Sequence, residues 1–311
     1  VCNQVADQLQ IGLETVLPFS TGVIGERLNV PALQQAVIEA ANSLDGESWL
    51  QAAQAIMTTD TVAKACSHQI SIAGEVITIT GIAKGSGMIK PNMATMLGFV
   101  GCDANISHAL LSVLVKQVAD ESFNRITVDG DTSTNDCFMV SATAKSRAPA
   151  ILSQKDEGYQ KLRDGLTKVA QFLAQAIIRD GEGATKFVTV RVAGGASAQE
   201  CLEVAYTVAE SPLVKTALFA GDANWGRFCM AIGRAEVVDL DVSNVALWLN
   251  DVEVARGGMM SSTYTEDAGA NVLAQNEFTV LIDLGRGEVS ETIWTTDLSY
   301  DYVRINAEYR T

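Results

Sequence analysis

One segment of the chain is unusually rich in glycine, asparagine and threonine for its apolar surroundings: Lys84-Gly-Ser-Gly-Met-Ile-Lys-Pro-Asn-Met-Ala-Thr-Met-Leu97. It begins with a flexible loop, Lys84–Gly87, and runs into Met96–Val100, a short apolar run that predicts a buried strand. Loops of this composition often carry function, because a rigid scaffold displays them. The segment is therefore the first candidate for a functional loop.

Three other segments share this composition: Ser20–Glu26, Thr127–Asp136 and Gly221–Arg227. A tight turn explains any single one of them equally well, because glycine, asparagine and aspartate are the usual turn residues. Four such segments in one chain favour a common, functional explanation.

The elements around these loops predict mixed α and β structure. Apolar residues at helical spacing predict helices that begin at Pro31 and that cover Ser48–Met57, Ser107–Ser122, Gly158–Asp180 and Ser197–Ala209. Apolar and β-branched runs predict strands at Gln69–Ile72 and Val76–Thr80, which the turn Ala73-Gly74-Glu75 would join as a hairpin. Further strands are predicted at Met96–Val100, 138–144, Phe187–Ala193, Val245–Leu249, Val252–Ala255, Phe278–Leu284 and, as a short one, Val303–Asn306. Because these elements follow no regular βαβ rhythm, we expect an α/β protein with the layers of an α+β sandwich.

The composition excludes several classes of protein. The net charge is −15, from 22 basic and 37 acidic residues, so the basic surface that nucleic-acid binding needs is not expected. No stretch approaches the roughly 20 apolar residues of a membrane span, and residues 1–20 do not resemble a signal peptide. We therefore expect a globular cytoplasmic protein that binds neither nucleic acid nor membrane.

Cysteine and histidine are too scattered or too few for two common kinds of site. The six cysteines form no CxxC pair, so neither a disulfide framework nor a metal site is predicted: Cys2, Cys66, Cys102, Cys137, Cys201 and Cys229. With only His68 and His108, a histidine triad is poorly supplied. Any nucleophile in this chain therefore needs another base.

The segment Lys84–Leu97 resembles the self-cleavage motif of the ornithine acetyltransferases, also called glutamate N-acetyltransferases. Four other segments resemble that family in order and spacing: Ser20-Thr-Gly-Val-Ile-Gly-Glu26, Thr127-Val-Asp-Gly-Asp-Thr-Ser-Thr-Asn-Asp136, Gly221-Asp-Ala-Asn-Trp-Gly-Arg227 and Asn306-Ala-Glu-Tyr-Arg-Thr311. The resemblance implies a self-cleaving enzyme of the amino-terminal-nucleophile-like type, with a layered sandwich fold. Family members usually carry about a hundred further residues before the point where this sequence begins, compared with typical domains of 100–150 residues.

The resemblance implies cleavage between Ala94 and Thr95 and makes Thr95 the nucleophile. The two pieces, 1–94 and 95–311, would interlock, and two such pairs would associate as a dimer. The chemistry is reasonable, because a freed threonine carries an α-amino group with a pKa of about 8. That amine can act as the base for its own hydroxyl, which removes the need for histidine.

The remaining site residues are carried over from the family. Thr21 and Gly22 would form the oxyanion hole, through the threonine hydroxyl and the glycine N–H. The substrate-binding positions would be Thr58, Lys84, Thr95, Glu182, Asn306 and Thr311. Lys84 suits an α-carboxylate, and Glu182 suits an ammonium group of ornithine. Without the family, each is an ordinary turn, loop or surface residue.

The implied reaction is a ping-pong exchange in arginine biosynthesis. N2-acetyl-L-ornithine would acetylate Thr95, and L-glutamate would then accept the acetyl group. No cofactor is implied, although some family members use acetyl-CoA as a second donor. No metal is expected either, because Asp129–Asp136 lacks the glycine and glutamate spacing of a calcium-binding EF-hand loop.

Two alternatives stay open at the level of sequence. A self-processing aminopeptidase or amidase would share the Thr95 chemistry but pass its acyl group to water. A binding protein that has kept the fold and lost catalysis would need none of these residues. All four residues of Ala94-Thr95 and Thr21-Gly22 are present, which favours an enzyme.

Overall fold

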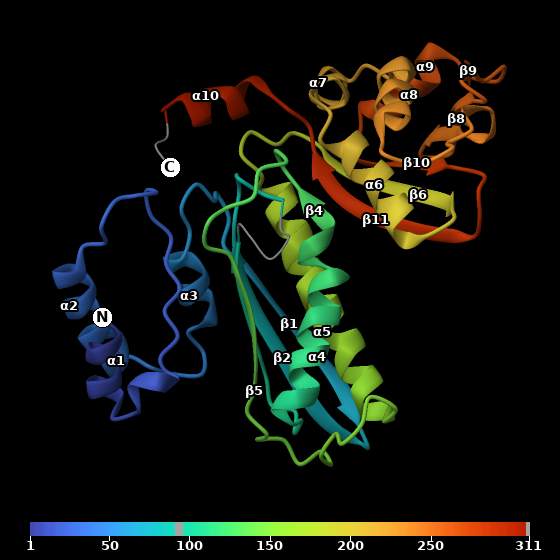
Figure 1. The fold of residues 1–311 in the computed structure, drawn as a ribbon. Coiled ribbons are helices and arrows are strands. Elements are labelled where there is room, and N and C mark those ends of the chain that lie inside the picture. The colour runs from blue at the N-terminus through green and yellow to red at the C-terminus, as the bar shows by residue number, and fades with distance from the viewer. Residues whose placement is uncertain (91–95, 309–311) are drawn as a thin grey trace.

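The computed structural model describes residues 1–90 and 96–308. Figure 1 shows two lobes, each built on a β-sheet, and a smaller group of helices at the N-terminal end of the chain. The expected layered α/β arrangement is confirmed, because helices pack on sheets in both lobes. None of the helices in the described part of the chain is both long and apolar enough to span a bilayer.

The first lobe contains a four-stranded sheet in the order β1-β2-β3-β5. Its strands are β1 (Lys64–Ile72), β2 (Glu75–Lys84), β3 (Leu97–Cys102) and β5 (Cys137–Ala142). The predicted hairpin of β1 and β2 is confirmed, and its turn residues Ala73 and Gly74 both have positive φ, as tight hairpin turns require. The last pair, β3 and β5, runs parallel.

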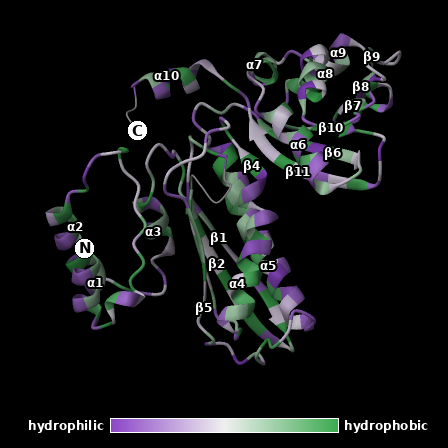
Figure 2. Ribbon diagram, viewed as in Figure 1, coloured by the Kyte–Doolittle hydropathy of each residue, from purple (hydrophilic) through white to green (hydrophobic). Residues whose placement is uncertain are grey.

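Two helices, α4 (His108–Asp120) and α5 (Glu157–Arg179), pack in the core of this lobe, with α5 against β1 and β2. The predicted periodicity of α5 is confirmed, because the side chains at three- and four-residue spacing are buried: Leu162, Leu166, Val169, Leu173 and Ile177. Figure 2 shows hydrophilic residues along the outer side of α5. The predicted start of α4 is confirmed by Ser107, whose hydroxyl accepts a hydrogen bond from the N–H of Leu110 (3.4 Å).

The second lobe contains a seven-stranded sheet in the order β4-β11-β6-β10-β7-β8-β9. Its strands are β4 (Ile126–Thr127), β11 (Val289–Thr296), β6 (Phe187–Gly195), β10 (Glu277–Asp283), β7 (Ala246–Leu249), β8 (Val252–Arg256) and β9 (Met259–Met260). Its helices are α6 (Ala198–Ala209), α7 (Pro212–Ala220), α8 (Trp225–Arg234) and α9 (Glu266–Leu273). Short β4 lies between β3 and β5 in sequence, so the chain visits the second sheet before it completes the first.

The N-terminal helices are α1 (Cys2–Leu9), α2 (Val30–Asn42) and α3 (Trp49–Ala55). Only α3 packs on the first sheet, where Ala53 is fully buried. None of the residues of α2, all of which the structure describes, is buried. An edge-to-face contact of Phe19 with Phe99 on β3 also brings the linker between α1 and α2 to this sheet.

Two sequence-based expectations are wrong. The predicted strand Val303–Asn306 lies instead within α10 (Tyr300–Glu308). That helix begins where the hydroxyl of Ser299 accepts the N–H of Tyr302 (3.2 Å), a capping contact that short apolar alternation does not reveal. The segment Gly221–Arg227 is a loop only in part, because its last three residues open α8.

A substitution on α5 should show that its apolar stripe holds the first lobe together. Leu173→Ala should lower the free energy of unfolding by about 2–5 kcal/mol, because it leaves a cavity in the core. Phe172→Ala is the matched control, since that neighbouring side chain is 53% exposed. Urea unfolding measures both. Equal losses in the two variants would show that the stripe is not the main contact of α5.

Candidate active site

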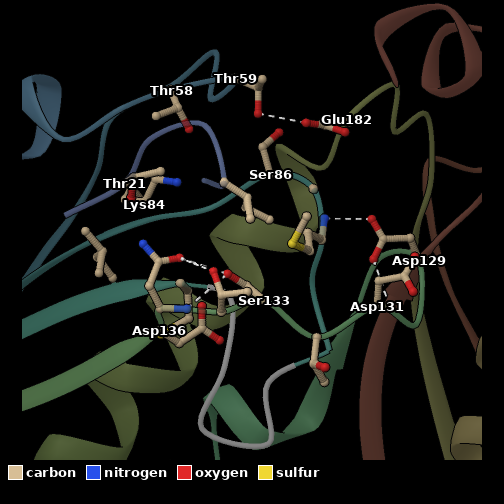
Figure 3. Close-up of a pocket in the computed structure, with 18 of the residues that line it drawn as sticks. Thr21, Thr58, Thr59, Lys84, Ser86, Asp129, Asp131, Ser133, Asp136 and Glu182 are labelled. Atoms are coloured by element: carbon tan, nitrogen blue, oxygen red, sulfur yellow. Dashed lines mark hydrogen bonds between the residues drawn. The ribbon is translucent and has the colours of Figure 1, made fainter. Parts of the chain in front are cut away.

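A cavity of about 350 Å³ lies where the loops of the first lobe meet α10. Figure 3 shows its lining residues. The structure brings six of the residues expected in the site to this one cavity: Thr21, Gly22, Thr58, Lys84, Glu182 and Asn306. The other expected residues, Ala94, Thr95 and Thr311, lie outside the described residues. Met96, which follows Thr95 in the chain, lines the cavity and is buried.

A buried ion-pair cluster holds two of the cavity walls in place. The ammonium group of Lys64 contacts Asp60 (2.7 Å) and Asp180 (2.6 Å), at the end of α5. Asp60 also accepts hydrogen bonds from the N–H of Thr58 (3.1 Å) and from the N–H of Gly85 (2.8 Å). Burial raises the pKa of Asp60, but these N–H groups and the Lys64 charge outweigh it and hold the pKa below its ordinary value.

Lys84 ends β2 at the cavity and is only 8% exposed. Burial lowers the pKa of its ammonium group, while the carboxylates of Asp60, Asp136 and Glu182 act in the opposite direction. It forms no ion pair with any residue in 1–90 or 96–308. A buried cation of this kind is suited to hold an anionic group of a ligand.

Glu182 lies just beyond α5 and is also 8% exposed. Its two carboxylate oxygens accept hydrogen bonds from the hydroxyl of Thr59 (2.8 Å) and from the side-chain amide of Asn306 (2.8 Å), so two expected site residues are in direct contact. Figure 3 shows the contact with Thr59. A Cβ atom on Gly87 would lie 2.2 Å from this carboxylate, so any larger residue there would displace the Glu182 side chain from its present position.

The loop Ser20–Glu26 meets the loop Thr127–Asp136 at the cavity. The side-chain amide of Asn135 donates a hydrogen bond to the carbonyl of Ser20, directly before Thr21 and Gly22. The expected oxyanion-hole residues are thus tied to a second loop that lines the same cavity.

Asp129 braces the chain shortly before the expected cleavage position. Its carboxylate accepts the N–H groups of Met88 (2.7 Å) and Ile89 (2.9 Å) and the hydroxyl of Tyr302 (3.2 Å). These contacts fix the start of the Thr127–Asp136 loop against the segment that precedes the expected cleavage position. No group of three or more histidine, cysteine or acidic side chains in the described ranges is arranged to hold a metal ion.

Sequence reasoning gave no role in the site to Asp136, which also lines the cavity. Burial raises the pKa of its carboxyl to about 7, although the Lys84 charge and the N–H of Met96 act in the opposite direction. One of its oxygens is buried without a hydrogen-bond partner among the described residues. The acidic composition of Thr127–Asp136 was the only signal in the sequence, and it does not distinguish Asp136 from its neighbours.

The segment Gly221–Arg227 does not line the cavity. Gly221 ends α7 in the left-handed conformation (φ 67°), and the guanidinium of Arg227 donates a hydrogen bond to the carbonyl of Leu213 (2.9 Å). These contacts give the segment a structural place within the second lobe.

Comparisons with known proteins identify the family of this chain. The ArgJ family model matches residues 1–311. The arginine biosynthesis bifunctional proteins ArgJ of Pseudomonas syringae and Pseudomonas fluorescens are 53% and 54% identical over 310 and 308 residues. These matches cover 100% and 99% of this chain and 76% of each relative.

A solved structure supports the same assignment. The crystal structure of the arginine biosynthesis bifunctional protein ArgJ from Bacillus halodurans matches with a TM-score of 0.63 and 36% identity, over 68% of this chain and 98% of that one. These matches confirm the resemblance to the glutamate N-acetyltransferases and, with it, the acyltransferase class and the fold. The chain belongs to the ArgJ family.

Proposed function

We propose that this protein transfers an acetyl group from N2-acetyl-L-ornithine to L-glutamate, as a step of arginine biosynthesis. The observation that carries the proposal is the meeting of six expected site residues, from distant parts of the chain, at one cavity. Membership of the ArgJ family supports the reaction class. Acetyl-CoA enters the proposal as a second donor, since the relatives are named bifunctional.

The chain would first cut itself. The hydroxyl of Thr95 would attack the carbonyl of Ala94 and form an ester, which water then opens to free the α-amine of Thr95. Contacts on both sides support such positioning: Lys90 pairs with Glu210 (2.8 Å), and the carbonyl of Met96 accepts the N–H of Cys137 (2.8 Å). The held ends would limit how far the scissile bond can move.

The pieces 1–94 and 95–311 would stay together after the cut. Strand β2 of the first piece pairs with β3 of the second along six residue pairs, from Ile79–Cys102 to Lys84–Leu97. The core of the first lobe likewise mixes side chains from both pieces. Association of two such pairs as a dimer, and a place in the cytoplasm, follow from the family resemblance and remain part of the proposal.

The cut enzyme would work by a ping-pong mechanism. Thr95, deprotonated by its own α-amine, would attack the acetyl group of the donor, with Thr21 and Gly22 donating hydrogen bonds to the oxyanion. Ornithine leaves, and glutamate takes the acetyl group from Thr95. Lys84 would hold the α-carboxylate that both substrates carry, and Glu182 would pair with the side-chain ammonium of ornithine.

Mass spectrometry under denaturing conditions tests the cleavage. The wild-type chain should give two pieces that break between Ala94 and Thr95. Thr95→Ala should give one species of 33.1 kDa, because it lacks the nucleophilic hydroxyl. Thr95→Ser keeps a hydroxyl and should still be cut. A break in the Thr95→Ala chain would show that another group does the chemistry.

Acetyl-enzyme formation separates the transferase from its rivals. With donor and no glutamate, the piece that begins at Thr95 should gain one acetyl group, and glutamate should then remove it as N-acetylglutamate. An aminopeptidase or amidase would instead release acetate at a rate that glutamate does not change. A binding protein would form no acetylated species.

A conservative substitution of Glu182 tests substrate discrimination. Glu182→Gln should lower kcat/KM for N2-acetylornithine about 10- to 100-fold, because a hydrogen bond to a charged group contributes about 1.5–3 kcal/mol. Transfer from acetyl-enzyme to glutamate should change less, since glutamate carries no side-chain ammonium. Glu253→Gln, outside the cavity, is the control. Equal losses in both half-reactions would contradict the assigned role.

A further inference from the structure

Asp136 lies beside Met96, the residue that follows the expected nucleophile Thr95 in the chain. Strands β3 and β5 run parallel with Leu97 opposite Cys137, and the N–H of Cys137 donates to the carbonyl of Met96 (2.8 Å). The main chain of Asp136 therefore lies beside Met96, the residue to which Thr95 is joined. Its side chain lines the cavity, on the same side as Lys84 and Thr21 in Figure 3.

One oxygen of the Asp136 carboxyl, Oδ2, is buried but receives no hydrogen bond from the described residues. A buried acceptor without a partner costs about 1–3 kcal/mol, so such groups are rare unless a ligand or water completes them. The carboxyl is thus placed to receive a hydrogen bond from something bound in the cavity.

The groups around Asp136 set its charge. Lys84 faces it from the end of β2 and favours its ionised form, while burial disfavours that form and brings the pKa to about 7. The carboxylates of Asp60 and Glu182 in turn favour the charged form of Lys84. The thiol of Cys137, next along the chain, has a pKa raised by its own burial and by the Asp136 charge. Near neutral pH, the protonated and the ionised forms of the Asp136 carboxyl are therefore both populated.

Acetyl transfer to an amine needs such a group. An amino acid arrives with its α-nitrogen as an ammonium, which has no lone pair and cannot attack an ester. A carboxylate can bind that ammonium through a charge-assisted hydrogen bond and then accept its proton. General bases work best when their pKa lies near the working pH.

We propose that Asp136 binds the α-ammonium of the acceptor amino acid and removes one proton from it as the amine attacks the acetyl group. The inference rests on the proposed acetyl-Thr95 function. The new C–N bond forms as the ester C–O bond breaks. Of the three ammonium protons, one goes to Asp136, one to the departing Thr95 oxygen, and one stays on the amide nitrogen. Asp136 then releases its proton to solvent.

The same carboxyl serves the first half-reaction in reverse. N2-acetylornithine is acetylated on its α-nitrogen, so the leaving amine occupies the position that the glutamate amine later takes. There the protonated carboxyl of Asp136 supplies the proton that makes the departing amine an ammonium. The two half-reactions should therefore depend on pH in opposite directions around pH 7.

The test uses Asp136→Asn and two acceptors. Cleaved enzyme, verified by intact mass, is acetylated with donor, freed of it, and mixed with glutamate or with hydroxylamine, which is already uncharged at neutral pH. Transfer to glutamate should slow about 100- to 10,000-fold, the usual contribution of a general base. Removal of the acetyl group by hydroxylamine should stay within a few-fold of wild type. Asp164→Asn, an exposed carboxylate paired with Arg163, is the control.

Each outcome decides the inference. Transfer to glutamate at the wild-type rate, or an equal loss with both acceptors, would overturn the role of Asp136 and leave the proposed function standing. A wild-type enzyme that forms no acetylated species would instead overturn the proposed function. Should the variant remain uncut, wild-type pH profiles decide. Transfer to glutamate, relative to hydroxylamine, should rise through pH 7 and then level off. A flat ratio, or one that keeps rising above about pH 8 as the acceptor's own ammonium loses its proton, would contradict the inference.

Discussion

The cavity depends on one buried cation, the ammonium group of Lys64, held between the carboxylates of Asp60 and Asp180. This cluster joins the start of β1, the loop before it and the end of α5. Through it, the N–H groups of Thr58 and Gly85 are fixed at the cavity. Removing one partner of a buried pair costs about 3–5 kcal/mol, since it strands the other charge. The positions of Thr58 and Gly85 at the cavity therefore depend on this cluster.

The sequence predicts those parts of the fold whose cause is local. The hairpin of β1 and β2 has alternating residues and a turn with glycine, and α5 has a regular apolar stripe, so both are predicted correctly. Helix α10 is not, because its start depends on Ser299, which also donates to the carbonyl of Gly183 (2.6 Å) far away in sequence. Contacts of this kind exist only after folding.

The residues of the site likewise fall into those that the sequence predicts and those that only the folded structure shows. The family resemblance implies substrate-binding positions at Lys84, Glu182 and Asn306, and the structure adds that the last two are in contact. Asp136 could not be selected from the sequence, since its chemistry comes from burial and from the nearby charge of Lys84, neither of which a run of acidic turn residues discloses. Resemblance to a family thus points to residues for which the family already has a role. The burial and charge around a side chain, which only the structure shows, point to residues such as Asp136 that have no such role.

The pairing of β2 with β3 has a consequence for the refolding of the cleaved protein. If the backbone is cut between them, as proposed, two separate polypeptides share the central strands of one sheet. The intact chain brings these strands together as neighbours on one backbone, but the severed pieces, once unfolded, would have to find each other by diffusion. Renaturation would then depend on protein concentration, although the first folding did not. The native form would be a state that the chain reaches easily only once.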